Sequence, residues 1–424
     1  MTDPIDFFRT VAAEHPRCFW LDGGGVREWS GQRSLIGWLD EDDVSLTFSA
    51  ARREVTRHAG GESSVVGEDV FAVLEETMAP GEQWFGYFGY ASRTDLPARP
   101  DPTLPDAVWM RARNVRIFEH APRSLSESPD IRGLPHVSGE TSPDTRQTPL
   151  TSEYAAAFAA VQEQLRAGNS YEVNLTYRLA QEAAGHPADA YLRLRDLNPA
   201  PYAGFLQHDV AGHEAWLLSS SPERYALITP DRTLQTKPIK GTAPRGATAE
   251  DDDRLSRTLA GDPKNRAENL MIVDLLRNDL AMVCEVGSVE VPALMQVESY
   301  ESVHQLVSTV SGRLRDDVST VGALRALFPA GSMTGAPKLR TMEIIDEVEE
   351  TPRGVYAGAF GWISGDGPAD LGVVIRSLMT AGDGRWTLGT GGGITVRSDL
   401  DDEWDESRWK ASKLLSVFET ETSD

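Results

Sequence analysis

One segment of the sequence places a carboxylate on an apolar helical face. In AENLMIVDLLRNDL, Glu268 shares that face with Ile272 and Leu275. Burying an unpaired carboxylate is costly, so the charge of Glu268 needs a partner. A bound metal ion would satisfy it, and so would an ion pair with a nearby arginine. The residues alone leave both interpretations open.

A second group of charges lies near the C-terminus. Glu403, Glu406, Lys410 and Lys413 fall at helical spacing and form one stripe. Such a stripe is usually a solvated face with salt bridges along it. If it binds a metal instead, oxygen ligands favour Mg²⁺, which takes few carboxylates and completes its shell with substrate and water.

Lysine is rare in this chain and absent from the first 236 residues, which directs attention to Lys240 in the segment KPIKGT. A lysine there can act as a nucleophile if it is neutral. Burial and a nearby cation both disfavour the charged form. We therefore expect a lowered pKa for Lys240, although most lysines are simply solvated.

Two features could bind an anion. Backbone N–H groups of the run Gly389–Gly393 could cradle one, or the run could be a tight turn or bulge. Arg376 alternates with Val374 and Leu378 in a strand-like run. An arginine on an apolar face indicates a carboxylate partner.

The elements that must position these residues mix helices and strands without regular βαβ alternation. Thr151 can cap a helix whose Tyr154, Phe158, Val161 and Leu165 share one face. A strand follows it. Three strand-like runs between residues 356 and 396, separated by Gly-Asp-Gly turns, indicate an antiparallel meander. The fold class is therefore α+β, with large antiparallel sheets and helices outside.

Composition limits the possible partners. The Pro-, Ser- and Asp-rich segment 121–149 predicts a linker or surface loop between an N-terminal part, 1–120, and a larger block, 150–424. A net charge of −24 argues against nucleic acid or an anionic membrane as partner. No apolar run is long enough for a membrane helix and no signal peptide is evident, so we expect a cytoplasmic protein.

Taken together, these patterns are similar to those of the chorismate-utilising enzymes, which include anthranilate synthase component I, aminodeoxychorismate synthase component I, and the isochorismate and salicylate synthases. The resemblance covers roughly residues 150–420 and, more weakly, 80–92. Collinear segments carry it, among them SYEVNLT, SSSPERY, PIKGTAPRG, AENLMIVDLLRNDL, SVHQLVSTV, FPAGSMTGAPKLRTMEIIDEVE, RGVYAGAFGWI and GTGGGITVRSDLDDEW. It implies sheets packed face to face and makes 150–424 the chorismate-binding catalytic domain.

The resemblance also implies roles for matched residues. Glu268 and Glu406 would hold Mg²⁺, with Glu403 as a further metal carboxylate. Glu223 would be the general acid that protonates the departing C4 hydroxyl, and His304 an active-site histidine near the ring. The substrate contacts would be Thr242, Thr334, Tyr356, Arg376, Gly391, Gly392, Gly393 and Lys410.

Two positions distinguish the branches of this family. Anthranilate synthases show PIAGT, whereas PIKGT, with Lys240, resembles the aminodeoxychorismate branch. In that branch the lysine attacks C2 of chorismate, and ammonia then enters at C4 and expels it. Isochorismate and salicylate synthases carry a water-activating lysine where this chain has Glu172. Aminating members more often have glutamine there, and the resemblance assigns Glu172 no role.

We therefore expect Mg²⁺-dependent amination of chorismate at C4 to 4-amino-4-deoxychorismate, on the route to p-aminobenzoate and folate. The sequence has no GxCxG elbow, and neither Cys18 nor Cys284 lies in a nucleophile turn. Ammonia should therefore come from a separate class I glutaminase subunit. Two alternatives remain: anthranilate synthase component I, and a non-catalytic relative that only binds chorismate or a glutaminase.

Overall fold

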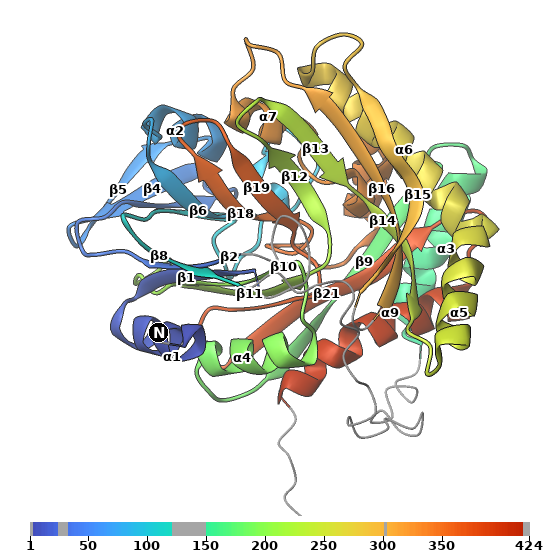
Figure 1. Ribbon diagram of the computed structural model, residues 1–424, viewed down its shortest axis with the longest axis horizontal. Coiled ribbons are helices and arrows are strands. Elements are labelled where there is room, and N and C mark those ends of the chain that lie inside the picture. The colour runs from blue at the N-terminus through green and yellow to red at the C-terminus, as the bar shows by residue number, and fades with distance from the viewer. Residues whose placement is uncertain (1–2, 24–32, 121–149, 301–302, 419–424) are drawn as a thin grey trace, which may run out of the picture.

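The computed structural model describes residues 3–23, 33–120, 150–300 and 303–418. Two large antiparallel sheets are stacked face to face, and helices cover their outer sides (Figure 1). The expected α+β class with this layering is confirmed. The segment 121–149, which we expected to be a linker or surface loop, lies outside the described residues.

The first sheet has the strand order β17-β9-β21-β20-β11-β10-β1-β2-β8. The bounds of these strands are β1 Arg17–Asp22, β2 Arg33–Trp38, β8 Asn114–Glu119, β9 Glu172–Glu182, β10 Tyr202–His208, β11 Ala215–Ser221, β17 Gly335–Ala336, β20 Ser377–Thr380 and β21 Arg385–Ile394.

The second sheet has the order β14-β16-β13-β12-β19-β18-β6-β7-β3-β4-β5, and β15 also pairs with β16. The bounds of these strands are β3 Ser45–Ser49, β4 Glu54–Ala59, β5 Glu62–Gly67, β6 Gln83–Phe88, β7 Ala107–Arg111, β12 Arg224–Ile228, β13 Thr233–Lys237, β14 Ile239–Pro244, β15 Glu290–Ser299, β16 Val303–Arg313, β18 Ala359–Ser364 and β19 Ala369–Val373. Strands from the first 120 residues therefore belong to both sheets.

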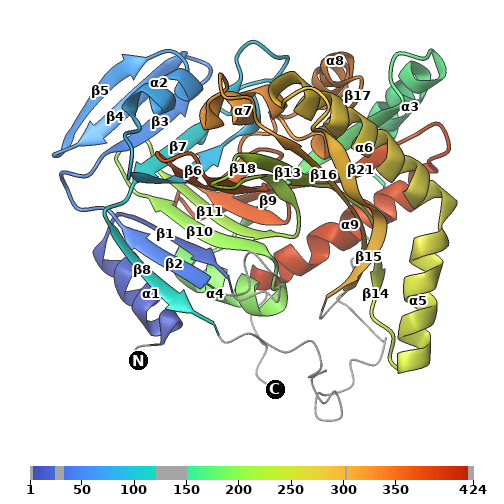
Figure 2. The same ribbon diagram turned by 45° about the horizontal axis from the view of Figure 1, so that its top comes forward.

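Helices flank both sheets. Helices α1, α4 and α9 contact the first sheet, whereas α5 and α6 run along β14–β16 of the second (Figure 2). The helix bounds are α1 Pro4–Glu14, α2 Val70–Thr77, α3 Ser152–Arg166, α4 Pro187–Leu197, α5 Ala249–Gly261, α6 Pro263–Val283, α7 Thr320–Leu327, α8 Lys338–Val348 and α9 Leu400–Leu415.

The main core lies between the two sheets, and the two-residue period of β1 shows how it is built. Phe19 points inward and stacks on Phe85 of β6, with ring centroids 3.9 Å apart. The next residue, Trp20, points outward and packs against Phe8 of α1 and Tyr191 of α4. Successive strand side chains face opposite sides of the sheet, so one strand serves both the inner core and the helix layer.

Helix α3 begins as expected. The Thr151 side chain accepts a hydrogen bond from the Tyr154 N–H, and Tyr154, Phe158, Val161 and Leu165 are buried. That face packs in a smaller core with β9, β21, α8 and α9. The cap and the apolar stripe together fix the start and orientation of the helix.

The strand-like runs near the C-terminus differ from the expected single meander. Strands β18 and β19 pair in the second sheet, whereas β20 and β21 pair in the first. The chain crosses between the sheets at residues 374–376, so Arg376 does not alternate along one strand with Val374 and Leu378. Its φ of 51° breaks the strand there, a conformation that costs of order 1–3 kcal/mol and is found mainly at functional sites.

A second crossover runs beside the first. Strand β11 belongs to the first sheet and β12 to the second, and Pro222 and Glu223 join them. The Ser220 N–H donates to the Arg376 carbonyl at 3.1 Å, and the Val373 N–H donates to the Glu223 carbonyl at 2.9 Å. The fold thus places a carboxylic acid and an arginine on adjacent crossovers between the sheets.

Candidate active site

A cavity of about 420 Å³ lies between the two crossovers, β14, β21, α6 and α9. Twelve of the residues singled out from the sequence line it, although they come from distant parts of the chain. They are Glu223, Lys240, Thr242, Glu268, Tyr356, Arg376, Gly391, Gly392, Gly393, Glu403, Glu406 and Lys410.

Glu223 is placed at the cavity by its crossover. Burial raises the pKa of Glu223 to about 7, while a hydrogen bond from the Ser332 hydroxyl and the charge of Lys240 act in the opposite direction. A carboxyl with this pKa is partly protonated at neutral pH. Glu223 can therefore donate a proton to a leaving group.

Arg376 presents a guanidinium to the cavity. Among the described residues Arg376 forms no ion pair with a carboxylate. The described part of the chain therefore does not supply the carboxylate partner that we expected from the sequence. The Arg376 guanidinium lies over the Trp409 ring, 5.5 Å from the centroid. Tyr356 also lines the cavity, and the Arg178 guanidinium lies 4.6 Å from the centroid of its ring. A carboxylate on a bound ligand would complete the bonding of Arg376.

The glycine run is a strand and not a turn. Gly389–Gly393 pair in register with β9, whereas β20 pairs with β21 only at Trp386 and Thr387. Beyond Thr387, β21 no longer pairs with β20, and Gly389–Gly393 line the cavity. A Cβ at Gly393 would lie 2.9 Å from Lys240 Nζ, a contact that real Cβ atoms essentially never show. Any larger residue here would therefore require the ends of the Lys240 and Glu172 side chains to shift.

Lys240 is buried and bonded to a carboxylate that we had left unassigned. Its Nζ donates a hydrogen bond to Oε1 of Glu172, which is completely buried at the start of β9. Our prediction that the pKa of Lys240 is lowered is wrong for this structure. Burial lowers that pKa, but Glu172, Glu268 and Glu223 together raise it above the usual lysine value.

Glu268 reaches the cavity from α6. Its side chain is 7% exposed, and its Oε1 has no hydrogen-bond partner among the described residues. Burial raises the pKa of Glu268 to about 7, although Lys240 lowers it. The alternative of an ion pair with a neighbouring arginine is not supported, because no such pair with Glu268 occurs in the described chain. This carboxylate is suited to a cation that the cavity would admit.

The two glutamates of α9 are already paired with lysines. Glu403 Oε1 accepts from Lys264 Nζ at 2.7 Å, and Glu406 Oε1 lies 2.7 Å from Lys410 Nζ. The described residues contain no group of three acidic, histidine or cysteine side chains arranged to hold a metal ion. Glu403 is 3% exposed, so the interpretation of this stripe as a solvated face is wrong for Glu403.

Two expected site residues do not line the cavity. His304 is buried on β16, with Nδ1 2.8 Å from Ser299 Oγ and Nε2 2.9 Å from Asp252 Oδ1. Gln305, the next residue along the strand, faces the cavity in its place. Thr334 is completely buried, and its carbonyl accepts from the Asn174 N–H at 2.9 Å. It therefore supports a lining residue without being one.

Sequence reasoning missed several lining residues. They are Asn174, Lys264, Asn265, Gln305, Ser332 and Trp409. Lys264 had a usable signal, since lysine is rare in this chain. Polar residues such as Asn174 and Ser332 had none, because nothing in their local pattern distinguishes them from surface residues.

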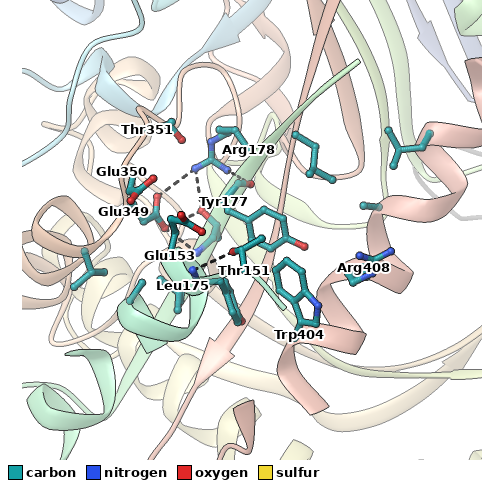
Figure 3. A pocket seen from close by; sticks show the side chains of 17 residues that line it. Thr151, Glu153, Leu175, Tyr177, Arg178, Glu349, Glu350, Thr351, Trp404 and Arg408 are labelled. Carbon is teal, nitrogen blue, oxygen red and sulfur yellow. Dashed lines mark hydrogen bonds and ion pairs between the residues drawn. The ribbon is translucent and has the colours of Figure 1, made fainter. Parts of the chain in front are cut away.

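A second cavity, of about 400 Å³, lies between α3, β9 and α9. It is lined by stacked Tyr177 and Trp404, with Arg178 and Glu349 to one side (Figure 3). Glu349 accepts from Arg178 and from Arg353, at 3.2 and 2.7 Å. Trp404 follows Glu403 on α9, and Arg178 also lies over the Tyr356 ring, so these side chains support the walls of the first cavity.

With this geometry in place, comparisons identify the family. The profile of the chorismate binding enzymes matches residues 17–416, and the chain belongs to this family. It is 38% identical to aminodeoxychorismate synthase of Streptomyces griseus over 97% of this chain and 62% of that protein. It is 42% identical to aminodeoxychorismate synthase component 1 of Escherichia coli over 79% of this chain and 76% of that protein.

Relatives with another name also match. Anthranilate synthase component 1 1 of Haloarcula marismortui is 43% identical over 91% of this chain and 75% of that protein. The solved structure of anthranilate synthase component I from Streptococcus pneumoniae superposes with a TM-score of 0.72 at 26% identity, over 92% of this chain and 93% of that chain. The chain spans 62–63% of the length of the two Streptomyces proteins.

Helices of the described chain include none that is both long and apolar enough to cross a membrane.

Proposed function

We propose that this chain aminates chorismate at C4 to give 4-amino-4-deoxychorismate, using ammonia delivered by a separate glutaminase subunit. The observation that carries the proposal is Lys240, which reaches the same cavity as the acid Glu223 and the guanidinium of Arg376. The names of the Streptomyces and Escherichia coli relatives support it. The expected cytoplasmic location remains part of the proposal.

The residues divide the work by chemistry. Arg376, with Tyr356 and the unpaired side of the glycine strand, would anchor one substrate carboxylate. Glu223 would protonate the C4 hydroxyl as it leaves, for which its pKa of about 7 is suited. Lys240 would attack C2, so that one difficult displacement becomes two easier ones. Ammonia would then add at C4 and release the lysine.

Mg²⁺ is the proposed cofactor. Glu268 and Glu406 would hold it, with Glu403 nearby, and the ion would neutralise the ring carboxylate of the substrate. The unbonded, buried Oε1 of Glu268 supports this fit. Mg²⁺ needs few protein carboxylates because substrate and water complete its shell. Glu406 would exchange Lys410 for the metal when it binds.

A product assay tests this function. The purified chain, chorismate, Mg²⁺ and ammonium at alkaline pH should give 4-amino-4-deoxychorismate, whereas glutamine should be inert until a glutaminase is added. Appearance of fluorescent anthranilate without an added lyase would favour the alternative function, anthranilate synthase. The Haloarcula relative carries that name. Turnover with glutamine by the single chain would contradict the separate ammonia source.

A further inference from the structure

Glu172 has a contact that the proposed function leaves without a purpose. It is 0% exposed, and its Oε1 accepts a hydrogen bond from Lys240 Nζ. Its Oε2 is buried and has no hydrogen-bond partner among the described residues. Two oxygens are therefore held in the protein interior, and only one of them is bonded. Such a carboxylate is expensive to maintain unless it has a role.

The surroundings of the pair show where a proton on Lys240 can go. Lys240 Nζ is ion-paired with Glu172, and the charges of Glu268 on α6 and of Glu223 on the crossover after β11 also act on it. On the side of β21 the neighbour is Gly393, which has no side chain and can accept no proton there. Glu223 is hydrogen-bonded to Ser332, and Glu268 is the proposed metal ligand. Oε1 of Glu172 is the acceptor already in contact with Nζ.

An ammonium cannot attack carbon, because its nitrogen has no free electron pair. Lys240 must therefore lose a proton after the substrate has filled the cavity and before the C2–N bond forms. We propose that Glu172 accepts this proton, and that it returns the proton when Lys240 is released. The inference rests on the proposed covalent route and assigns a catalytic role to Glu172.

The step balances in protons and electrons. The Lys240 ammonium gives one proton to Glu172 Oε1, and its free electron pair forms the bond to C2. The two conjugated double bonds of the ring shift, the C4–O bond breaks, and Glu223 supplies the proton that makes the leaving group water. Ammonia then attacks C4, both double bonds shift back, and the C2–N electrons return to Lys240. The new C4 ammonium reprotonates Glu223, and Glu172 returns the proton to Lys240.

The Glu172→Gln variant tests this role because it keeps the size and one hydrogen-bond acceptor but cannot take a proton. In wild type the proton passes within the pair, so adduct formation should change little with pH below about 7, where Glu223 still holds the proton that it must donate. In Glu172→Gln, Lys240 must lose its proton to solvent before chorismate enters. The rate should then be at least about tenfold lower at about pH 7 and, below that pH, rise about tenfold per pH unit. Glu172→Asp should recover part of the rate.

The readout is the rate of mass increase on the Lys240 peptide, with chorismate and Mg²⁺ but without ammonia, as a function of pH. Glu343→Gln, the same chemical change at a partly exposed residue of α8 outside the cavity lining, is the matched control and should behave as wild type. Unchanged melting temperatures would confirm that the variants fold. A wild-type rate and pH profile in Glu172→Gln would overturn the role of Glu172. Absence of any adduct in wild type, with active Lys240→Ala, would instead refute the covalent route itself.

Discussion

Gly393 offers a sharp test of the packing around Lys240. In Gly393→Ala, the new Cβ would lie 2.9 Å from Lys240 Nζ and 3.0 Å from Glu172 Cδ, with Glu172 Oε1 closer still. Ordinary contact begins at 3.4 Å, so Lys240 Nζ must retreat by about 0.5 Å and Glu172 Oε1 by roughly 1 Å. A misplacement of about 1 Å can cost about 10²-fold in rate. Overpacking of this kind also destabilises by about 1–3 kcal/mol.

The assay is kcat/KM for ammonium-dependent amination, together with a thermal melt. Gly261→Ala is the matched control, because a Cβ at Gly261 meets nothing within 4 Å. It should leave the rate unchanged. A Gly393→Ala enzyme within a factor of about three of wild type, well below the loss expected for a 1 Å displacement, would refute the claim that the position of the Lys240–Glu172 pair limits the rate.

Two further predictions concern the carboxyl groups of the cavity. Burial raises the pKa of Glu268 to about 7 from its usual 4.5, so this group should contribute a loss of up to about 3 kcal/mol in the stability of the metal-free protein between these pH values as the pH rises. Glu268→Gln should remove this contribution and the stabilisation by Mg²⁺, as measured by chemical unfolding at several pH values. A pH dependence equal to that of wild type would count against the assignment. Glu223 must be protonated to act as an acid, so kcat should fall as the pH rises above about 7. In Glu223→Gln, kcat should be about 10²–10⁴-fold lower and should no longer fall above that pH. A variant whose kcat still falls there would exclude Glu223 as the source of this pH dependence.

Most of the site could be predicted from the sequence because its residues lie in motifs whose order matches the family. The sequence could not predict which of the two sheets each motif joins. The run around Arg376 is strand-like on both sides, and a two-residue hydrophobic period does not reveal that one half belongs to another sheet. Only the tertiary fold brings the crossovers 222–223 and 374–376 together.

The charge state of Lys240 could not be predicted for a similar reason. Its partner Glu172 lies 68 residues earlier in the chain, and nothing local to either residue indicates the contact. Burial alone argued for a lowered pKa, and three neighbouring carboxylates reverse that sign. The sequence could not place His304, because a strand pattern does not reveal which of two successive side chains of β16, His304 or Gln305, faces the cavity.

The central claim is that Lys240 forms a covalent bond to the substrate. The most direct measurement is the mass of the Lys240 peptide after the protein is incubated with chorismate and Mg²⁺ without ammonia. We expect an adduct on Lys240 that disappears when ammonium is added, as product forms. An unmodified peptide, together with undiminished turnover of Lys240→Ala, would contradict it and leave Lys240 as an electrostatic contact alone.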